Sequence, residues 1–299
     1  MALIIDGKKI SDEIRKEIKD DLDSLRKRGI LPHLSVILVG DNPASHVYVR
    51  MKEKACTEIG ISSETLRVPE TVSQSELIGM IDDLNGKQSV NGILVQLPLP
   101  SHINENIILE RILPDKDVDG FHPVNMGKLA AGIKEGFIPA TPAGIVELLM
   151  RTGNYPEGKN VVIVGRSNIV GKPVGLLLLH KAKYGNATVT FCHSKTRDLK
   201  MITKSADILI AAIGIPEMIT KEMIKPGAVV IDVGVNRVED KSRKKGYRLV
   251  GDVKFDEVSK IASAITPVPG GVGPMTITML LRNTLKACKK SLGEQGRMS

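Results

Sequence analysis

The amino-acid sequence predicts an α/β protein of about two domains, the second built on a parallel, doubly wound sheet. In the second half of the chain, strand signals alternate with helix signals, which is typical of repeated βαβ units. An apolar strand, a glycine turn and a helix also follow one another between Asn160 and Lys183. The length of 299 residues allows two domains, each with its own core.

The composition excludes several classes of protein. The hydrophobic fraction of 42% and the charged fraction of 25% are ordinary for a globular protein. No apolar run approaches the roughly 18 residues of a membrane span, and the N-terminus turns polar too early for a signal peptide. We therefore expect no membrane partner. The net charge of +8 suggests a basic surface that attracts anionic substrates. Because basic residues alternate with acidic ones and Trp is absent, we expect no nucleic-acid partner.

Cysteine usage bears on compartment and metal binding. Cys56, Cys192 and Cys288 are odd in number and far apart, with the spacing of neither a disulfide framework nor a metal site. We expect a cytoplasmic protein without a bound metal.

The first domain shows alternating helix and strand patterns in order along the chain. Ile10 to Leu25 has helical apolar spacing and ends at Gly29, and Ser73 to Glu76 forms a capping box that opens another helix. The other expected elements are a strand at 34–39, a helix at 44–59, a strand at 65–68, a strand at 92–96 and a helix near 104–112.

A domain boundary is expected between Phe137 and Thr141. Thr141 and Pro142 have the pattern of an N-cap and a first helical residue, which predicts a helix to about Arg151. Strands follow from Val161 and at 187–191, 207–212 and 228–233, and the tail from 275 to 290 is expected to be one helix that could pack back on the first domain. The predicted domains are 1–139 with 275–299, and 140–274.

The segment from Gly165 to Pro173 has the pattern of a phosphate-binding loop. Glycine lets the backbone approach a pyrophosphate, and the helix N-terminus offers N–H groups and a positive dipole end. Ser167 occupies the position of the second glycine in the standard G-x-G-x-x-G pattern. The loop alone leaves open an ordinary strand-to-helix turn.

The end of the second strand of this domain indicates which dinucleotide is bound. An acidic residue usually stands there and holds the ribose 2′-hydroxyl of NAD. Here Phe191 is followed by Cys-His-Ser-Lys-Thr-Arg, with no acid. Together with Arg166, the nearby Ser194 and Arg197 suit a 2′-phosphate, so the sequence favours NADP.

Polar residues of the first domain gather at the expected carboxyl edge of its sheet. Ser45, Tyr48 and Lys52 share one face of the helix that follows the strand at 34–39, and Gln96 ends another strand. Each has an alternative interpretation, a solvated helix face for the first three and a solvent contact for Gln96.

Two loops complete the candidate site. Asp117 and Asp119 lie in a short acidic loop, where they could bind a ligand or only stabilise an Asx turn. The segment from Pro267 to Thr276 carries three glycines among prolines, which predicts a rigid, narrow ribbon against which a flat ligand can lie.

Five segments in this order resemble one family. They are Ser45–Ala55, Val95–Pro100, Lys116–Gly120, Gly165–Pro173 and Pro267–Thr276, and they are similar to the motifs of the bifunctional methylenetetrahydrofolate dehydrogenase/cyclohydrolases. The resemblance covers essentially the whole chain. It implies two α/β domains flanking a cleft, the second Rossmann-like, in a cytoplasmic homodimer formed through the cofactor domain.

The resemblance also implies an activity. The enzyme would oxidise 5,10-methylenetetrahydrofolate with NADP and hydrolyse the methenyl product to 10-formyltetrahydrofolate, in the one-carbon metabolism that supplies purine biosynthesis. The implied catalytic residues are Lys52, Gln96, Tyr48 and Asp119, with Lys52 as the catalytic lysine, Gln96 supporting it, Tyr48 against the folate ring and Asp119 at the pterin amino edge. Pro269, Gly270 and Gly273 would line the folate slot, and Gly165, Arg166, Ser167, Ser194 and Val235 would contact the cofactor.

Two other functions remain open on the residues alone. One is a different NADP-linked, two-domain dehydrogenase of the shikimate type. The other is a non-catalytic dinucleotide-binding protein, which would leave the set Tyr48, Lys52, Gln96 and Asp119 without a role.

Overall fold

The computed structural model describes residues 1–243 and 246–294. The chain divides into two compact units. Unit 1 comprises Met1–Asp12 and Thr141–Thr276, and unit 2 comprises Glu13–Ala140 and the chain from Ile277 onward. Two of the three boundaries fall inside the long helices α1 (Gly7–Arg26) and α10 (Val272–Ser291), and the third falls at the start of α6 (Ala140–Arg151). Among the described residues, no helix is both long and apolar enough to cross a bilayer.

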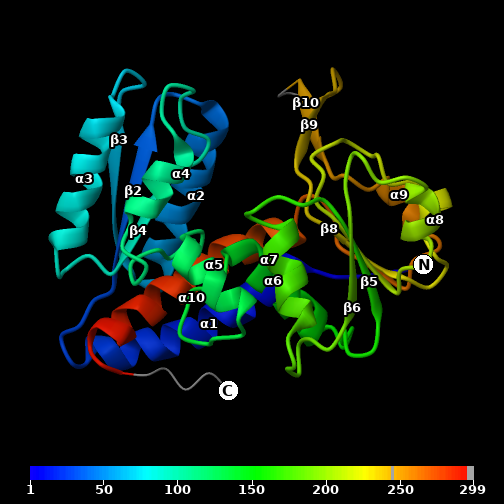
Figure 1. Ribbon diagram of the computed structural model, residues 1–299, viewed down its shortest axis with the longest axis horizontal. Helices are drawn as coiled ribbons and strands as arrows, with labels where there is room; N and C mark the ends of the chain where they lie inside the picture. Colours follow the sequence, from blue (N-terminus) through cyan, green and yellow to red (C-terminus); the bar gives the residue numbers. More distant parts are fainter. Residues whose placement is uncertain (244–245, 295–299) are drawn as a thin grey trace. The chain divides into compact units, whose positions relative to one another are not determined.

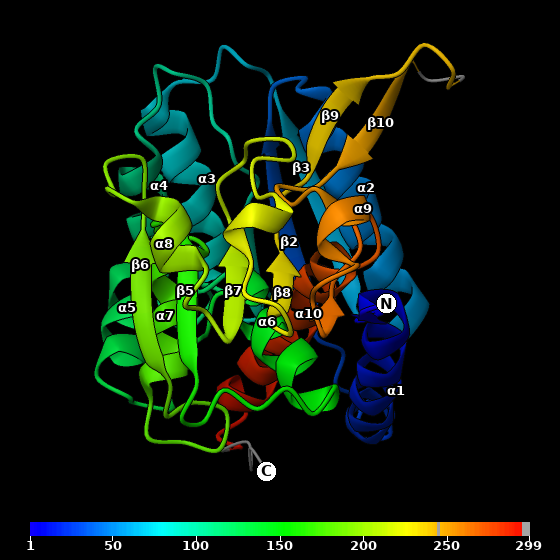
Figure 2. The ribbon, with the colours of Figure 1, turned by 90° about the vertical axis from the view of Figure 1, so that its right-hand side faces the viewer.

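Unit 1 is built on a six-stranded parallel sheet with the order β1-β11-β8-β7-β5-β6. From β5 the chain passes outward to β6 and then returns to β7 on the other side, so the doubly wound topology predicted from the sequence is confirmed. Figure 2 shows β6, β5, β7 and β8 side by side. The strands are β1 (Leu3–Ile4), β5 (Asn160–Val164), β6 (Thr188–Cys192), β7 (Ile208–Ala211), β8 (Val229–Asp232) and β11 (Ala264–Ile265).

Apolar, β-branched residues explain the central strands. Val162, Leu209 and Val230 are fully buried, and they belong to one core cluster shared by β5, β7 and β8. The helices of this part of the chain are α6 (Ala140–Arg151), α7 (Gly171–Leu179), α8 (Leu199–Thr203), the 3-10 helix η1 (Lys221–Met223) and α9 (Phe255–Val258). A separate antiparallel hairpin consists of β9 (Asn236–Glu239) and β10 (Tyr247–Val250).

Unit 2 contains a three-stranded parallel sheet with the order β3-β2-β4. Helix α2 packs on β2 and β3, while α3 packs on β4 and α4 (Figure 1). The elements are β2 (His33–Val39), α2 (Pro43–Ile59), β3 (Ser62–Val68), α3 (Gln74–Gly86), β4 (Gly92–Val95), α4 (Glu105–Arg111) and α5 (Pro123–Ala130).

Local signals fix both ends of the helices in unit 2. The Asn42 side chain accepts hydrogen bonds from the backbone N–H groups of Ala44 and Ser45, and α2 ends at Gly60 with a left-handed φ of 86°. The predicted capping box at Ser73 and Glu76 is present, with both reciprocal hydrogen bonds.

The structure differs from the sequence expectation at several boundaries. Residues 1–12 belong to unit 1, because β1 extends its sheet beside β11, whereas the predicted division grouped them with residues up to 139. Helix α7 ends at Leu179 and not near Lys183, and α6 begins at Ala140, so Thr141 lies inside its first turn. Helix α10 begins at Val272, three residues earlier than expected, so the second half of the predicted ribbon is helical.

Candidate active site

Helix α2 carries the first group of predicted residues in unit 2. Ser45 and Lys52 are buried, with 3% and 8% of their surface exposed, whereas Tyr48 between them is 43% exposed. A solvated helix face would expose its lysine, because lysine is almost never buried without a partner. Burial of Lys52 therefore decides against that alternative and leaves Tyr48 as an accessible aromatic ring one helical turn away.

Gln96 is the partner of the Lys52 amine. It follows β4 directly, and its backbone N–H donates to the Ile37 carbonyl of β2 at 2.9 Å. Its side-chain Oε1 accepts from Lys52 Nζ at 3.1 Å, and its Nε2 donates to the Leu97 carbonyl at 2.7 Å. The second bond orients the amide so that its oxygen faces the amine. The lysine thus has a neutral acceptor, which positions it without adding charge.

Burial sets the protonation of this lysine. The loss of hydration lowers the pKa of Lys52, while the negative charge of the nearby Asp119 opposes the shift. Burial in turn raises the pKa of Asp119, against the opposing effect of Lys52. Burial also raises the pKa of Cys56 to about 11, so this thiol stays neutral near pH 7. A lysine with a lowered pKa can exchange protons with a substrate closer to neutral pH.

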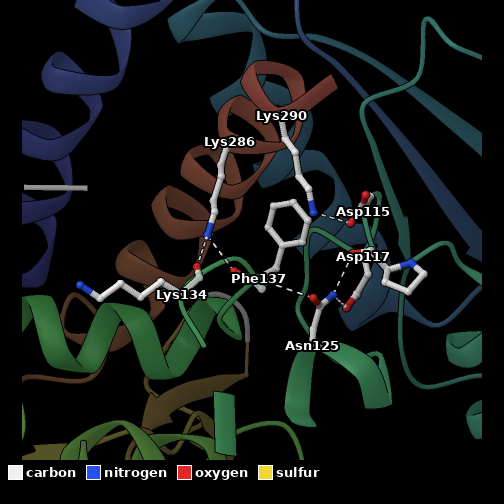
Figure 3. Close-up of polar contacts among 9 residues, drawn as sticks. Asp115, Asp117, Asn125, Lys134, Phe137, Lys286 and Lys290 are labelled. Atoms are coloured by element: carbon white, nitrogen blue, oxygen red, sulfur yellow. Dashed lines mark hydrogen bonds and ion pairs between the residues drawn. The ribbon is translucent and has the colours of Figure 1, made fainter. Parts of the chain in front are cut away.

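The two aspartates that the sequence could not tell apart have different surroundings. Asp117 is buried, and its carboxylate accepts from the backbone N–H groups of Gly120, Phe121 and His122. It also accepts from Asn125 Nδ2 (Figure 3). With both oxygens occupied, Asp117 stabilises the turn of the loop. Asp119 is the carboxylate whose charge acts on Lys52.

One face of α10 holds the loop that carries Asp119. Asn283 Nδ2 donates to the carbonyls of Val118 and Ile138 at 2.8 and 2.9 Å, so the residue directly before Asp119 is tied to the helix. Lys290 forms an ion pair with Asp115 at 2.5 Å on the same loop (Figure 3). Asn283 was not predicted, because a single asparagine in an amphipathic helix carries no sequence signal for a partner 165 residues away.

Lys286 supports the neighbouring turn. Its Nζ donates to the carbonyls of Lys134 and Gly136 at 3.3 and 2.7 Å and lies 5.5 Å from the centre of the Phe137 ring (Figure 3). Burial lowers the pKa of Lys286. These contacts are all within unit 2.

The glycine loop at the end of β5 has the close approaches that a dinucleotide site needs. Gly165 has φ 133°, and a Cβ there would overlap the Ala212 carbonyl oxygen after β7. A Cβ on Gly171 would overlap the Gly165 carbonyl, and a Cβ on Gly175 would overlap the Phe191 ring of β6. The tight turn and the close helix–strand packing of the standard fingerprint are therefore present with a different spacing.

Ser167 explains the missing second glycine. Its Oγ accepts from the backbone N–H groups of Val170 and Gly171 at 3.2 and 3.3 Å, at the start of α7. The expectation that these two N–H groups are free for a phosphate is corrected. A hydroxyl that accepts two hydrogen bonds still has its own proton to donate. Ser167 can therefore donate a hydrogen bond to an anion that lies near the positive end of the helix dipole.

The remaining residues predicted to contact the cofactor lie at the carboxyl edge of the unit 1 sheet. Arg166, after β5, and Ser194 and Arg197, after β6, are exposed. The turn after β6 is closed by Thr196 Oγ1, which accepts from the His193 backbone N–H at 2.8 Å. Val235, 46% exposed, follows β8 at the same edge. In NAD-binding domains an acidic residue usually stands at the end of the second strand, which is β6 here. The exposed guanidinium groups of Arg197 after β6 and Arg166 after β5 instead fit the 2′-phosphate of NADP.

The residues expected to line the folate slot belong to unit 1. Pro269 and Gly270 follow β11, and Gly270 has φ 109°. Gly273 lies in the first turn of α10, where a Cβ would meet no atom within 4 Å. In the described part of the chain, no group of three or more His, Cys, Asp or Glu side chains could hold a metal ion.

A parallel sheet with a glycine-rich edge and a separate unit with a buried lysine define a two-domain, dinucleotide-dependent enzyme. Two family models cover nearly the whole chain, the tetrahydrofolate dehydrogenase/cyclohydrolase catalytic domain over residues 5–119 and its NAD(P)-binding domain over 139–292. The chain belongs to the tetrahydrofolate dehydrogenase/cyclohydrolase family.

Individual relatives support this at high coverage. The Bifunctional protein FolD of Brevibacillus brevis is 55% identical over 97% of this chain and 98% of its own. The crystal structure of the bifunctional enzyme FolD from Campylobacter jejuni matches with a TM-score of 0.91 and 50% identity, covering 97% of this chain and 99% of that one. The Trypanosoma brucei FolD, complexed with NADP cofactor and inhibitor, matches with a TM-score of 0.92 and 42% identity, covering 97% and 98%.

The chain is accordingly a bifunctional enzyme of one-carbon folate metabolism, an NADP-dependent methylenetetrahydrofolate dehydrogenase and a methenyltetrahydrofolate cyclohydrolase. The predictions of family, fold class, activity and cofactor are confirmed. The alternatives of a shikimate-type dehydrogenase and a non-catalytic protein are set aside.

Proposed function

We propose that Lys52 carries the proton transfers of the hydrolytic step and that the carboxyl edge of unit 1 serves the hydride transfer. The observation that carries the first part is the buried Lys52 amine, which has a lowered pKa and a hydrogen bond to the neutral Gln96 amide. An ordinary surface lysine would be protonated and hydrated near pH 7.

Oxidation needs little acid–base help from the protein. When bound, NADP would supply the hydride acceptor for oxidation of the methylene carbon of the substrate, which gives the methenyl cation. The contribution of the chain is to hold two flat partners face to face, which accelerates a reaction through proximity and orientation. Tyr48, Asp119, Pro269, Gly270 and Gly273 are the proposed folate contacts.

Hydrolysis of the methenyl cation requires three proton movements. Water adds to the carbon between N5 and N10 and loses a proton, which leaves a hydroxyl on that carbon. The bond from the carbon to N5 then breaks while N5 gains a proton, and the hydroxyl releases its remaining proton to solvent as the formyl C=O forms. Lys52 in its neutral form accepts the first proton and as an ammonium donates the second, so the lysine returns to its starting state. Gln96 holds the amine in place through both transfers.

The cofactor is proposed to bind through residues that follow the carboxyl ends of β5, β6 and β8. Gly165 and Ser167 would hold the pyrophosphate, Arg166, Ser194 and Arg197 the 2′-phosphate, and Val235 the far half of the dinucleotide. The support is their common location at one edge of the unit 1 sheet, where ligands of doubly wound sheets bind.

Three further proposals concern the setting of the enzyme. We propose a cytoplasmic homodimer formed through unit 1, with unit 2 as the folate-binding domain, and a role in supplying formyl groups for purine biosynthesis. The three free, buried cysteines are consistent with a reducing compartment. The outer position of β6 in its sheet leaves a strand edge that a second copy could cover. Sedimentation velocity at several protein concentrations tests the dimer.

The function is tested with purified protein, 5,10-methylenetetrahydrofolate and NADP, following reduced cofactor and the methenyl intermediate together. We expect reduced cofactor to form while the methenyl species stays low, because it is hydrolysed in turn. Equal efficiency with NAD and NADP would contradict the cofactor assignment, and accumulation of the methenyl species in stoichiometric amounts would contradict the second activity.

A further inference from the structure

Unit 1 contains a pair of buried carboxylates that the site described above does not use. Asp232 is the last residue of β8, and Asp252 follows β10 by two positions. They are 3% and 0% exposed. Two aspartates buried side by side are unfavourable unless their oxygens are satisfied, because each has lost its hydration.

Asp252 joins the loops that follow β7 and β8. Its Oδ2 accepts from the backbone N–H groups of Ile213 and Gly214 at 2.6 and 2.9 Å. Its Oδ1 accepts from Asn236 Nδ2 at 2.9 Å. One carboxylate therefore fixes residues 212–214 and the end of the loop 233–236 with respect to each other.

Asp232 holds Asp252 in place. Its Oδ1 accepts from the backbone N–H groups of Gly234 and Asp252 at 3.0 and 2.9 Å, and its Oδ2 accepts from Val253 at 2.9 Å. Thr266 Oγ1 accepts from the Asp232 backbone N–H at 2.7 Å, which links the pair to the strand end of β11. The two carboxylates thus act together on three loops.

Two glycines make room for the pair. A Cβ on Gly234 would overlap the Asp252 carboxylate, and a Cβ on Gly251 would overlap the Asp232 carboxylate. Each aspartate occupies a space that only glycine leaves free on the opposite loop. The arrangement is reciprocal.

The loops held by the pair lie where the second half of a dinucleotide binds. The adenosine side is on β6, because the ribose 2′-position is recognised at the end of the second strand. The sheet order continues from β5 through β7 to β8 on the other side of the glycine loop, so the nicotinamide half belongs there. The Ala212 carbonyl packs directly on Gly165, which places the clamped loop beside the pyrophosphate loop. Ile215 and Val235 present exposed apolar side chains from these loops.

We infer that Asp232 and Asp252 are positioning residues for the nicotinamide half of NADP, acting through the backbone of residues 212–214 and 233–236. The inference rests on the NADP-linked dehydrogenase function. Burial and the neighbouring Asp252 charge raise the pKa of Asp232 to about 7, against three backbone hydrogen bonds that lower it, so burial of the Asp232 carboxylate is unfavourable in itself.

The test is Asp252→Asn, with Asp207→Asn as the matched control. Asp207 stands just before β7, at the opposite end of that strand, where it accepts from the Asn160 backbone N–H and from Lys225 Nζ. In Asp252→Asn the new amide N–H₂ group faces a donor, either Asn236 Nδ2 or the N–H groups of Ile213 and Gly214. The clamp therefore weakens, because either Asn236 must turn its amide to accept the new N–H or the two backbone N–H groups lose their acceptor, and in both cases the charge that strengthens these hydrogen bonds is lost.

Five measurements separate positioning from a general structural role. In cofactor-free protein, hydrogen exchange of peptides covering 212–216 and 233–237 should accelerate. The dissociation constant of NADP and the dehydrogenase turnover should each worsen by roughly tenfold. The dissociation constant of 2′,5′-ADP, which contains only the adenosine half, should change by less than about twofold. Hydrolysis of methenyltetrahydrofolate supplied directly should also change by less than about twofold, since it needs no cofactor. Asp207→Asn should leave all five unchanged.

Unchanged NADP affinity and turnover in Asp252→Asn would overturn the inference, and so would equal weakening of NADP and 2′,5′-ADP. Absence of NADP-linked oxidation in the unsubstituted protein would instead overturn the assigned function. If Asp252→Asn does not fold, Asn236→Leu removes only the link from Asp252 Oδ1. Asn236→Leu should then weaken NADP affinity and dehydrogenase turnover by about two- to threefold while 2′,5′-ADP affinity and direct hydrolysis stay the same. Unchanged NADP affinity in this variant would count against the inference.

Discussion

The sites around Lys52 in unit 2 and Gly165 in unit 1 both lie at the carboxyl edge of a parallel sheet, but they are built in opposite ways. Around Lys52 the chemistry depends on side chains, because a buried amine, a neutral amide and a nearby carboxylate set one protonation equilibrium. Around Gly165 it depends on the absence of side chains, because Gly165, Gly171 and Gly175 let backbone and helix come close. Proton transfer needs a titratable group, whereas hydride transfer needs alignment.

The two units nevertheless use aspartate in a similar way. Asp117 in unit 2 and the pair Asp232 and Asp252 in unit 1 have both carboxylate oxygens taken by N–H groups, and they hold loops. Asp119 differs, since its charge acts on Lys52. The hydrogen bonds that a carboxylate accepts from N–H groups thus distinguish the aspartates that hold loops from the one that is available to a ligand.

The largest expected effect is on hydrolysis in Lys52→Met, which keeps the apolar stem and removes the amine. Cyclohydrolase activity should fall by roughly 10²–10⁴-fold, the range for loss of a positioned acid–base group. Dehydrogenase activity should survive in part. The measurement is hydrolysis of methenyltetrahydrofolate supplied directly, followed by a separate assay of NADP reduction.

Lys54→Met is the matched control on the same helix. The Lys54 side chain is 78% exposed and pairs with Glu58 at 3.7 Å. Its loss should leave both activities within about twofold, because exposed ion pairs contribute little. Undiminished hydrolysis in Lys52→Met would show that the buried lysine has no catalytic role.

The next effect concerns Asp119→Asn. A charge-assisted hydrogen bond contributes about 1.5–3 kcal/mol, so both activities should fall together by roughly tenfold or more if Asp119 anchors the folate. Removing its negative charge should also lower the pKa of Lys52 further, since that charge stabilises the ammonium form. The pH profile of hydrolysis should then shift to lower pH. A fall in only one activity would make Asp119 specific to that step and not a shared anchor.

A smaller effect is expected for Arg166→Ala at the unit 1 edge. Arg166 is exposed and solvent screens its charge, so the preference for NADP over NAD should narrow by roughly fivefold, through the KM for NADP. Initial rates with both cofactors measure this, with direct hydrolysis of the methenyl substrate as the internal control. An equal rise in the KM for NAD would assign Arg166 to the pyrophosphate.

The smallest effect on activity is expected for Asn283→Ala. Loss of its two bonds to the Val118 and Ile138 carbonyls should lower the unfolding free energy by about 1–3 kcal/mol. It should raise the KM for folate by only about two- to threefold, because the Asp117 network still holds the loop. Denaturant unfolding and steady-state kinetics provide the two values. A loss of turnover without a change in KM would contradict a positioning role for Asn283.

The sequence predicted those helices and strands that are determined by local signals, such as apolar periodicity and capping residues. The apolar runs of β2, β4, β5, β7 and β8 and the capped helices α2 and α3 follow from periodicity and end signals. Strand β1 was not predicted because it has only two residues. The hairpin β9–β10 was not predicted because its strands contain charged residues and are largely exposed or half-buried, unlike the fully buried apolar runs of the four-residue strands β4, β7 and β8. The pairing of β1 with β11 joins residues at opposite ends of the chain.

The sequence predicted those site residues whose type points to one chemical role, such as a lysine beside a neutral amide. Lys52 and Gln96 could be placed at one edge, and the structure brings them into contact. The functions of Asp117 and Asp119 could not be separated, because only the folded loop shows which carboxylate the backbone occupies. Asn283, Asp232 and Asp252 carried no signal, since their partners are distant in sequence.

The central claim, that a lysine with a lowered pKa separates the two reactions, is tested by the pH dependence of kcat/KM for direct hydrolysis of methenyltetrahydrofolate. The neutral amine is the base, so the rate should fall as pH decreases through the pKa of Lys52, below the ordinary lysine value of 10.5. The dehydrogenase profile should lack this ionisation, and Lys52→Met should abolish it. A hydrolysis profile that keeps the same ionisation in Lys52→Met, or an ionisation at or above the ordinary lysine value, would contradict the account.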